Sequence, residues 1–163
     1  MSDVVPEQCL QALCEESQTL FLTARDDDAD SGVSLVRVDL AGKKVLSTVA
    51  LADDTNMIMY SAANKTLLAW TESEAGVGEL VAVDPASGLR LATIASFPNL
   101  TPNGLSGSGS TYDPATHSVI ATLTNMSNPG HPAGTPVAVS VNLLTGATST
   151  RRSEWFAFAM DAW

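Results

Sequence analysis

Three stretches of similar pattern decide the fold: Leu35-Val36-Arg37-Val38-Asp39, Leu80-Val81-Ala82-Val83-Asp84 and Val137-Ala138-Val139-Ser140-Val141-Asn142. Each stretch is rich in β-branched and aliphatic residues and ends in a side chain that accepts hydrogen bonds. Each is followed by a glycine (Gly42, Gly88 and Gly146) and then by a second β-prone run. A strand–turn–strand pattern that recurs along the chain indicates a repeat architecture.

The spacing of the repeat is about the size of one four-stranded unit. Asp39 and Asp84 are 45 residues apart (39 to 84), and Asn142 follows Asp84 after 58 residues (84 to 142). The additional length lies in 98–110 and 128–136, which are rich in Gly, Pro and Ser and are expected to be long loops.

The second copy shows the predicted unit most clearly. We expect four strands in it, over residues 57–62, 66–73, 79–84 and 89–96. The turn Asp84-Pro85-Ala86-Ser87-Gly88 combines an Asp that can accept bonds from the turn, a Pro with fixed φ and a Gly that tolerates positive φ. Helical periodicity is nearly absent, so the sequence predicts an all-β fold of antiparallel four-stranded repeats.

Two sequence motifs of this chain resemble parts of the blades of YVTN-type and quinoprotein-like β-propellers. They are Asp-Pro-Ala-Ser-Gly at 84–88, after a strand, and Tyr-Asp-Pro-Ala-Thr-His-Ser-Val at 112–119, before one. The resemblance implies about three propeller blades. We place them after an N-terminal arm (1–8) within a repeat domain (9–163), as blades 9–52, 53–97 and 98–152 and an extra strand 155–163.

Three blades are fewer than the four to eight that propellers typically have, so we expect a partial ring. In one alternative, Pro6–Glu16 is a short helix and Phe156–Trp163 opens the first blade of a partner chain. In the other, Gln11–Cys14 is already the opening strand, because 15–20 matches the spacing of 62–67. Both alternatives predict a homo-oligomer or a protein partner that completes the ring.

Composition and net charge disfavour some classes of binding partner. The chain has 163 residues, 45% of them hydrophobic, and a formal net charge of −10 from 18 acidic and 8 basic residues. This charge disfavours nucleic acid, which is bound by neutralising phosphates, and disfavours anionic membranes. No apolar run approaches the roughly 20 residues of a membrane helix.

The N-terminal region bears on the compartment. Met1-Ser2-Asp3 is not followed by a basic and then an apolar segment, so we expect no signal peptide. Cys9 and Cys14 on one extended strand would have Cα atoms about 16 Å apart, beyond disulfide reach. We therefore expect free thiols and a cytoplasmic protein, with an extracellular location as the alternative if a signal peptide has been removed.

An acidic segment is a candidate calcium loop. Asp26, Asp28 and Asp30 stand at alternate positions and could direct carboxylates at one Ca²⁺. The glycine comes one place later than in an EF-hand loop, and Arg37 stands where the closing Glu would be. A solvated hairpin loop is the alternative interpretation.

Pro102-Asn103-Gly104-Leu105 resembles the Asn-Gly-Leu motif of the SMP-30/gluconolactonase family. That resemblance implies a six-bladed propeller that hydrolyses lactones or esters with a divalent metal in its central channel. Asn103 would be one metal ligand, and Glu7 and Asp161 are the candidates for the other two. Such a metal would polarise a carbonyl group and activate water.

Other catalytic patterns are missing from the sequence. It contains no HExxH motif, no phosphate-binding Gly loop before a helix and no Ser/His/Asp spacing. We therefore predict a non-catalytic β-propeller-type module for protein–protein interaction or assembly, without a cofactor. A divalent-metal-dependent lactonase or esterase is the alternative.

Overall fold

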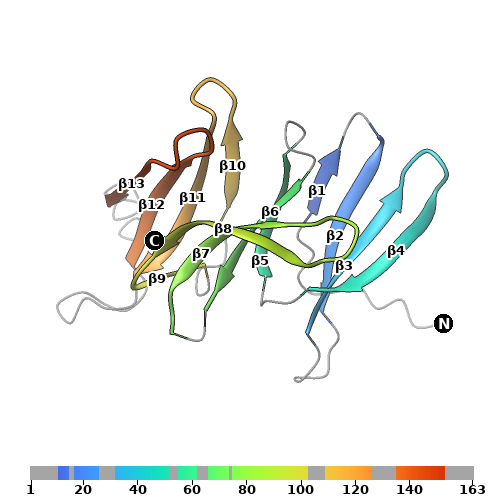
Figure 1. Ribbon diagram of the computed structural model, residues 1–163, viewed down its shortest axis with the longest axis horizontal. Helices are drawn as coiled ribbons and strands as arrows, with labels where there is room; N and C mark the ends of the chain where they lie inside the picture. The colour runs from blue at the N-terminus through green and yellow to red at the C-terminus, as the bar shows by residue number, and fades with distance from the viewer. Residues whose placement is uncertain are drawn as a thin grey trace, which may run out of the picture. The chain divides into compact units, whose positions relative to one another are not determined.

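The computed structural model describes residues 11–14, 17–25, 32–51, 55–61, 66–73, 75–102, 109–125 and 135–152. These residues form strands in three antiparallel sheets, labelled in Figure 1. Within these ranges there is no helix of the length and apolar character that a membrane crossing requires.

The strands follow the chain order within each sheet. The first sheet has the order β1 (Gln11–Cys14), β2 (Thr19–Arg25), β3 (Val33–Asp39) and β4 (Lys44–Ala50). The second has the order β5 (Thr55–Ser61), β6 (Thr66–Glu72), β7 (Gly78–Val83) and β8 (Arg90–Phe97). The third has the order β10 (Ser110–Asp113), β11 (Ser118–Asn125), β12 (Thr135–Asn142) and β13 (Thr148–Arg152), and β9 (Leu100–Thr101) also pairs with β11.

The all-β, four-stranded repeat predicted from the sequence is confirmed. In the second copy the predicted strand ends agree with those of β5–β8 to within two residues. At the N-terminus, residues 11–14 form strand β1 paired with β2, so the alternative of a helix over residues 6–16 is wrong there. The expectation that 98–110 is entirely loop is also wrong, because Leu100 and Thr101 form β9. The predicted extra strand 155–163 lies outside the described residues.

The hairpin turns share a backbone conformation and a pattern of hydrogen bonds. The residue four places after each strand-ending acceptor has positive φ: Lys43 (50°), Gly88 (72°), His117 (52°) and Gly146 (71°). The acceptor side chain binds backbone N–H groups of its own turn, as Asp84 does with Ala86 (3.1 Å) and Asn142 with Leu144 (3.0 Å). In the first copy the glycine falls one place early, and Gly42 donates to Asp39 instead (2.9 Å). The acidic turns are therefore structural devices that close hairpins.

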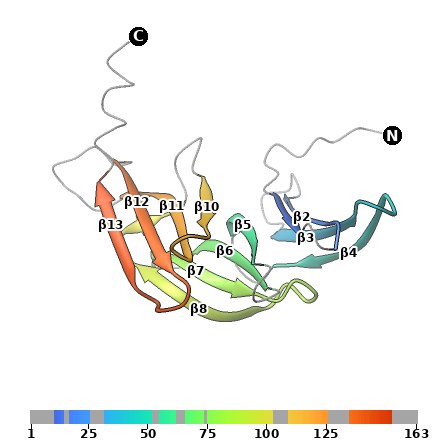
Figure 2. The ribbon, with the colours of Figure 1, turned by 90° about the horizontal axis from the view of Figure 1, so that it is seen from above.

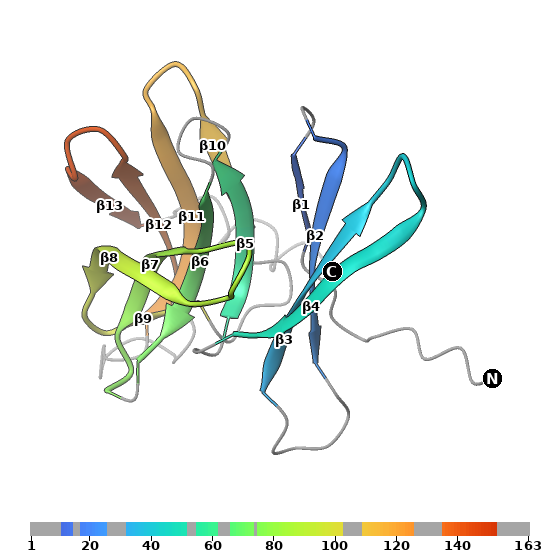
Figure 3. The same cartoon turned by 45° about the vertical axis from the view of Figure 1, so that its right-hand side comes forward.

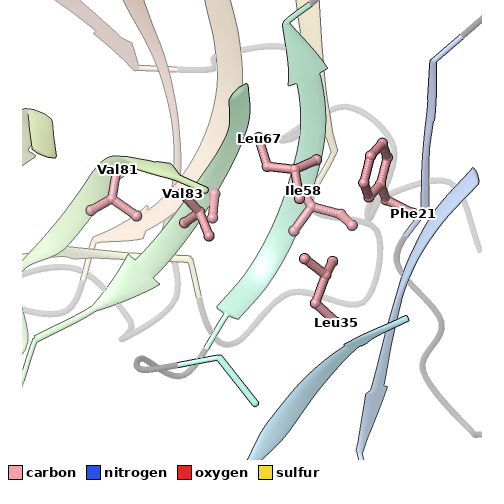
Figure 4. Close-up of a cluster of buried hydrophobic side chains, with 7 residues drawn as sticks. Phe21, Leu35, Ile58, Leu67, Val81 and Val83 are labelled. Atoms are coloured by element: carbon pink, nitrogen blue, oxygen red, sulfur yellow. The ribbon is translucent and has the colours of Figure 1, made fainter. Parts of the chain in front are cut away.

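The chain divides into two compact units. The first comprises 1–71 and 80–93, and the second comprises 72–79 and 94–163. The core of the first unit lies between the β1–β4 and β5–β8 sheets (Figure 4). Its buried members come from both sheets: Phe21, Leu35, Ile58, Leu67, Ala69, Val81 and Val83. The Phe21 and Tyr60 rings stack across the two sheets, with centroids 5.4 Å apart and planes 13° apart.

The second unit contains the β10–β13 sheet, seen from above in Figure 2. Alternate residues in the middle of β11 and β12 are buried, among them Val119, Leu123, Val139 and Val141. Strand β9 is held on β11 by the pairing of Thr101 with Thr124, and the Thr101 hydroxyl donates to the Glu72 carboxylate.

We predict that Leu35→Ala lowers the free energy of unfolding by about 2–5 kcal/mol, because it leaves a cavity between the two sheets of the first unit. Leu35 is fully buried, whereas the neighbouring Val36 points to the opposite face of β3 and is half-buried. Val36→Thr is therefore the matched control, with an expected loss below about 1 kcal/mol. Urea denaturation measures both variants, and equal losses would contradict the packing of β3 described here.

We also predict a pH effect at the hairpin turns. The pKa of Asp84 lies below its usual value of 3.8, mainly because the Ser87 hydroxyl donates to it, and secondly because Ala86 N–H donates. A lowered folded-state pKa means that the turn is stabilised above pH 3.8 and loses this stabilisation as the pH falls through the folded-state pKa. Ser87→Ala should move the pKa of Asp84 upward in a carboxyl NMR titration. Asp113 is the internal control, since Thr116 and Ala115 hold its pKa down. No change at Asp84, or an equal change at Asp113, would contradict this.

Candidate interaction surface

The site residues predicted from the sequence lie outside the described residues. These are Glu7, Asn103 and Asp161 of the lactonase hypothesis and Asp26, Asp28 and Asp30 of the calcium hypothesis. Both hypotheses therefore stay predictions. In the part of the chain that the structure describes, no group of three or more His, Cys, Asp or Glu side chains is placed to hold a metal ion.

Two further residues have structural roles. Trp70 in β6 is 1% exposed and belongs to the buried core. His117 occupies a positive-φ turn position, and its Nδ1 lies 3.1 Å from the Tyr112 hydroxyl.

The strands of the β1–β4 sheet of the first unit are drawn in Figure 3. The side chains on its two faces differ in character. Side chains at directly opposite positions of paired strands share a face, and successive residues alternate between faces. The inner face packs on the β5–β8 sheet, and on β2 and β3 it contains the buried Thr19, Phe21, Thr23, Val33 and Leu35. The register places nine other residues of β2, β3 and β4 on the outer face.

These nine residues form three cross-strand rows. The rows are Leu20–Val38–Val45, Leu22–Val36–Thr48 and Ala24–Ser34–Ala50. None of the nine is charged and seven are apolar. None of them is buried, and Val45 is 60% exposed. We call these nine residues the outer face.

The β10–β13 sheet of the second unit provides a comparison, because one of its faces is polar. The face opposite its buried side contains mainly hydroxyl groups and one cation, in rows such as Thr111–Ile120–Ser140–Ser149 and Thr122–Ala138–Arg151. The hydroxyl groups of Ser140 and Ser149 lie 3.3 Å apart and form a hydrogen bond. A polar face of this kind is usual for an antiparallel sheet in water.

The outer face departs from this rule. Three strands about 4.8 Å apart and about 20 Å long give a flat area of about 300 Å². An area of this size lies at the lower end of the range for the largest apolar patch of a typical monomer, about 300–600 Å², and such patches are often functional. The nine residues have no ionisable side chain and include two hydroxyl groups, those of Ser34 and Thr48.

The sequence contains a signal for this face, namely apolar residues at consecutive positions of two strands. In β2 the residues Leu20, Phe21 and Leu22 are apolar at consecutive positions, and β3 contains Leu35, Val36 and Val38. A strand that is apolar on both faces indicates that both faces become covered. The pattern alone does not reveal which face is covered within the chain.

Comparison with solved structures supports a β-propeller-like fold. The structure is similar to a chain of hydrazine synthase from Kuenenia stuttgartiensis, a protein that contains β-propellers, with a TM-score of 0.62 and 14% sequence identity. The similar region covers 86% of this chain and 40% of that chain, so this chain spans less than half the length of the protein it resembles. At this identity the likeness concerns the fold alone. No family model matches the sequence, and no curated protein matches it.

Proposed function

We propose that this chain is a non-catalytic, β-propeller-type binding module, and that its outer face binds a second copy of the chain. The observation that carries the proposal is the uncharged outer face of the β1–β4 sheet, with seven apolar positions among nine and none of them buried. Covering this face would remove apolar side chains from water, which is the main favourable term in protein association.

Electrostatics favours a second copy at this particular face. A chain with a net charge of −10 repels another copy of itself over most of its surface. The nine residues of the outer face add no charge to such a contact. Two outer faces can therefore meet about a two-fold axis, each presenting the same apolar rows, as in an isologous dimer of packed sheets.

Sheet packing inside the first unit provides the precedent. There the inner face of the same sheet packs on the β5–β8 sheet through Phe21, Leu35 and their neighbours. The outer face would pack on a partner sheet by the same apolar contacts. Its area is small beside the roughly 800 Å² per partner of a standard interface, so we expect a weak dimer with a dissociation constant on the order of 100 µM.

Sedimentation equilibrium of the full chain over about 10 µM to 1 mM tests the proposal, a range that brackets the expected dissociation constant. We expect a monomer–dimer equilibrium in the wild type and a monomer in Val36→Lys, because the variant places a buried, unpaired cation in each half of the interface. Ile120→Lys is the matched control. It changes an exposed aliphatic residue on the polar face of the β10–β13 sheet, and should leave the dimer unchanged.

Two results would overturn the proposal. If the wild-type chain is monomeric up to the highest concentration measured, a second copy of the chain does not bind the outer face. A dimer that survives Val36→Lys, with circular dichroism showing an intact fold, would exclude the outer face as the contact.

A further inference from the structure

The outer face differs from the rest of the chain in its charge. The chain has 18 acidic and 8 basic residues and a net charge of −10, whereas none of the nine outer-face residues is ionisable. A contact between two outer faces therefore brings two strongly acidic chains together without an ion pair among the residues that touch. Attraction and repulsion in such a dimer come from different parts of the molecule.

The charged residues next to the outer face do not offset the net charge. Four of them adjoin outer-face positions along β2, β3 and β4: Arg25, Arg37, Asp39 and Lys44. Their charges sum to +2, so the rest of the chain contributes −12 (−10 less +2). Arg37 lies over the Phe21 ring at 5.9 Å, and Asp39 accepts from Gly42 N–H of its own turn (2.9 Å). The repulsion between two copies is therefore produced by charges elsewhere in the chain.

Repulsion of this kind depends on the ionic strength. Two sheets packed face to face are about 10 Å apart, and the charges lie outside the contact, so most charges of one copy are farther than this from those of the other. Exposed charges are largely screened beyond the Debye length, which is about 14 Å at 0.05 M and about 4 Å at 0.5 M salt. Salt therefore removes most of the repulsion, while the short-range apolar contact persists.

We propose that ionic strength regulates the dimer on which the proposed function rests. Two copies repel at low salt and associate through the outer face as the salt concentration rises. The sign is diagnostic, because an association driven by opposite charges weakens with salt. Without screening, two net charges of −10 repel by many times the thermal energy. We expect the dissociation constant to fall about tenfold or more between 0.05 M and 0.5 M NaCl.

Sedimentation equilibrium of the full chain in 0.05 M and 0.5 M NaCl tests this. Val36→Lys, which the proposed contact makes monomeric, provides the baseline for general repulsion between chains at each salt concentration. MgCl₂ at equal ionic strength should act as NaCl does, since screening depends on ionic strength. A much larger effect of MgCl₂ would show that a bound cation, and not screening, controls the dimer.

Two double variants in β13 separate screening from other effects of salt on the contact. Thr148 and Thr150 are exposed and do not belong to the outer face. Thr148→Lys with Thr150→Lys changes the net charge from −10 to −8, and Thr148→Glu with Thr150→Glu changes it to −12. The product of the charges of two copies then falls by about a third or rises by about 40%. In 0.05 M NaCl the first variant should dimerise several-fold more tightly than the wild type and the second several-fold more weakly. In 0.5 M NaCl the three dissociation constants should agree within about twofold.

The outcomes distinguish this inference from the proposed function. A wild-type dimer whose dissociation constant stays unchanged or rises with NaCl overturns the inference and leaves the dimer standing. Double variants that shift in the same direction, or whose shifts persist in 0.5 M NaCl while circular dichroism shows an intact fold, do the same. A chain that is monomeric at both salt concentrations overturns the dimer and its regulation together.

Discussion

The apolar contact between the β1–β4 and β5–β8 sheets is the interaction on which the first unit depends. Neither sheet is stable as a single layer, because each has at least one face of aliphatic and aromatic side chains that must leave water. Phe21 and Leu35 from one sheet meet Ile58 and Leu67 from the other (Figure 4). The Phe21 ring also stacks on the ring of Tyr60 in β5. Once the inner face is covered in this way, the register of β2, β3 and β4 determines which residues stay on the outer face. The proposed dimer contact consists of these outer-face residues.

The fold could be predicted from the sequence because its signals are local. The acceptor residues Asp39, Asp84 and Asn142 each start a turn that depends on bonds within four residues, and the strands between the turns are short and β-prone. These patterns predicted the strands of the second copy closely. The prediction missed β9, since a two-residue strand has no pattern of its own. It forms because Thr101 and Leu100 pair with the end of β11, and the paired residues Thr101 and Thr124 are 23 residues apart (101 to 124).

The candidate surface could not be predicted in the same way. The sequence motifs indicated candidate sites at residues such as Asn103 and Asp28, whereas the outer face consists mainly of ordinary aliphatic residues in strands. Leu22 and Phe21 look alike in the sequence, and only the pairing of the sheets shows that one is covered and the other is not. The informative property of the outer face is the absence of charged side chains at positions that strand pairing brings together.

A double-mutant cycle between Phe21 and Tyr60 tests most directly whether the two sheets pack face to face. Phe21→Leu, Tyr60→Leu and the double variant would be compared by urea denaturation of the full chain. The packing described here predicts a coupling energy of about 0.5–1.5 kcal/mol between the two rings. Losses that add to within about 0.3 kcal/mol would show that the rings do not touch, and would contradict the arrangement on which the outer face depends.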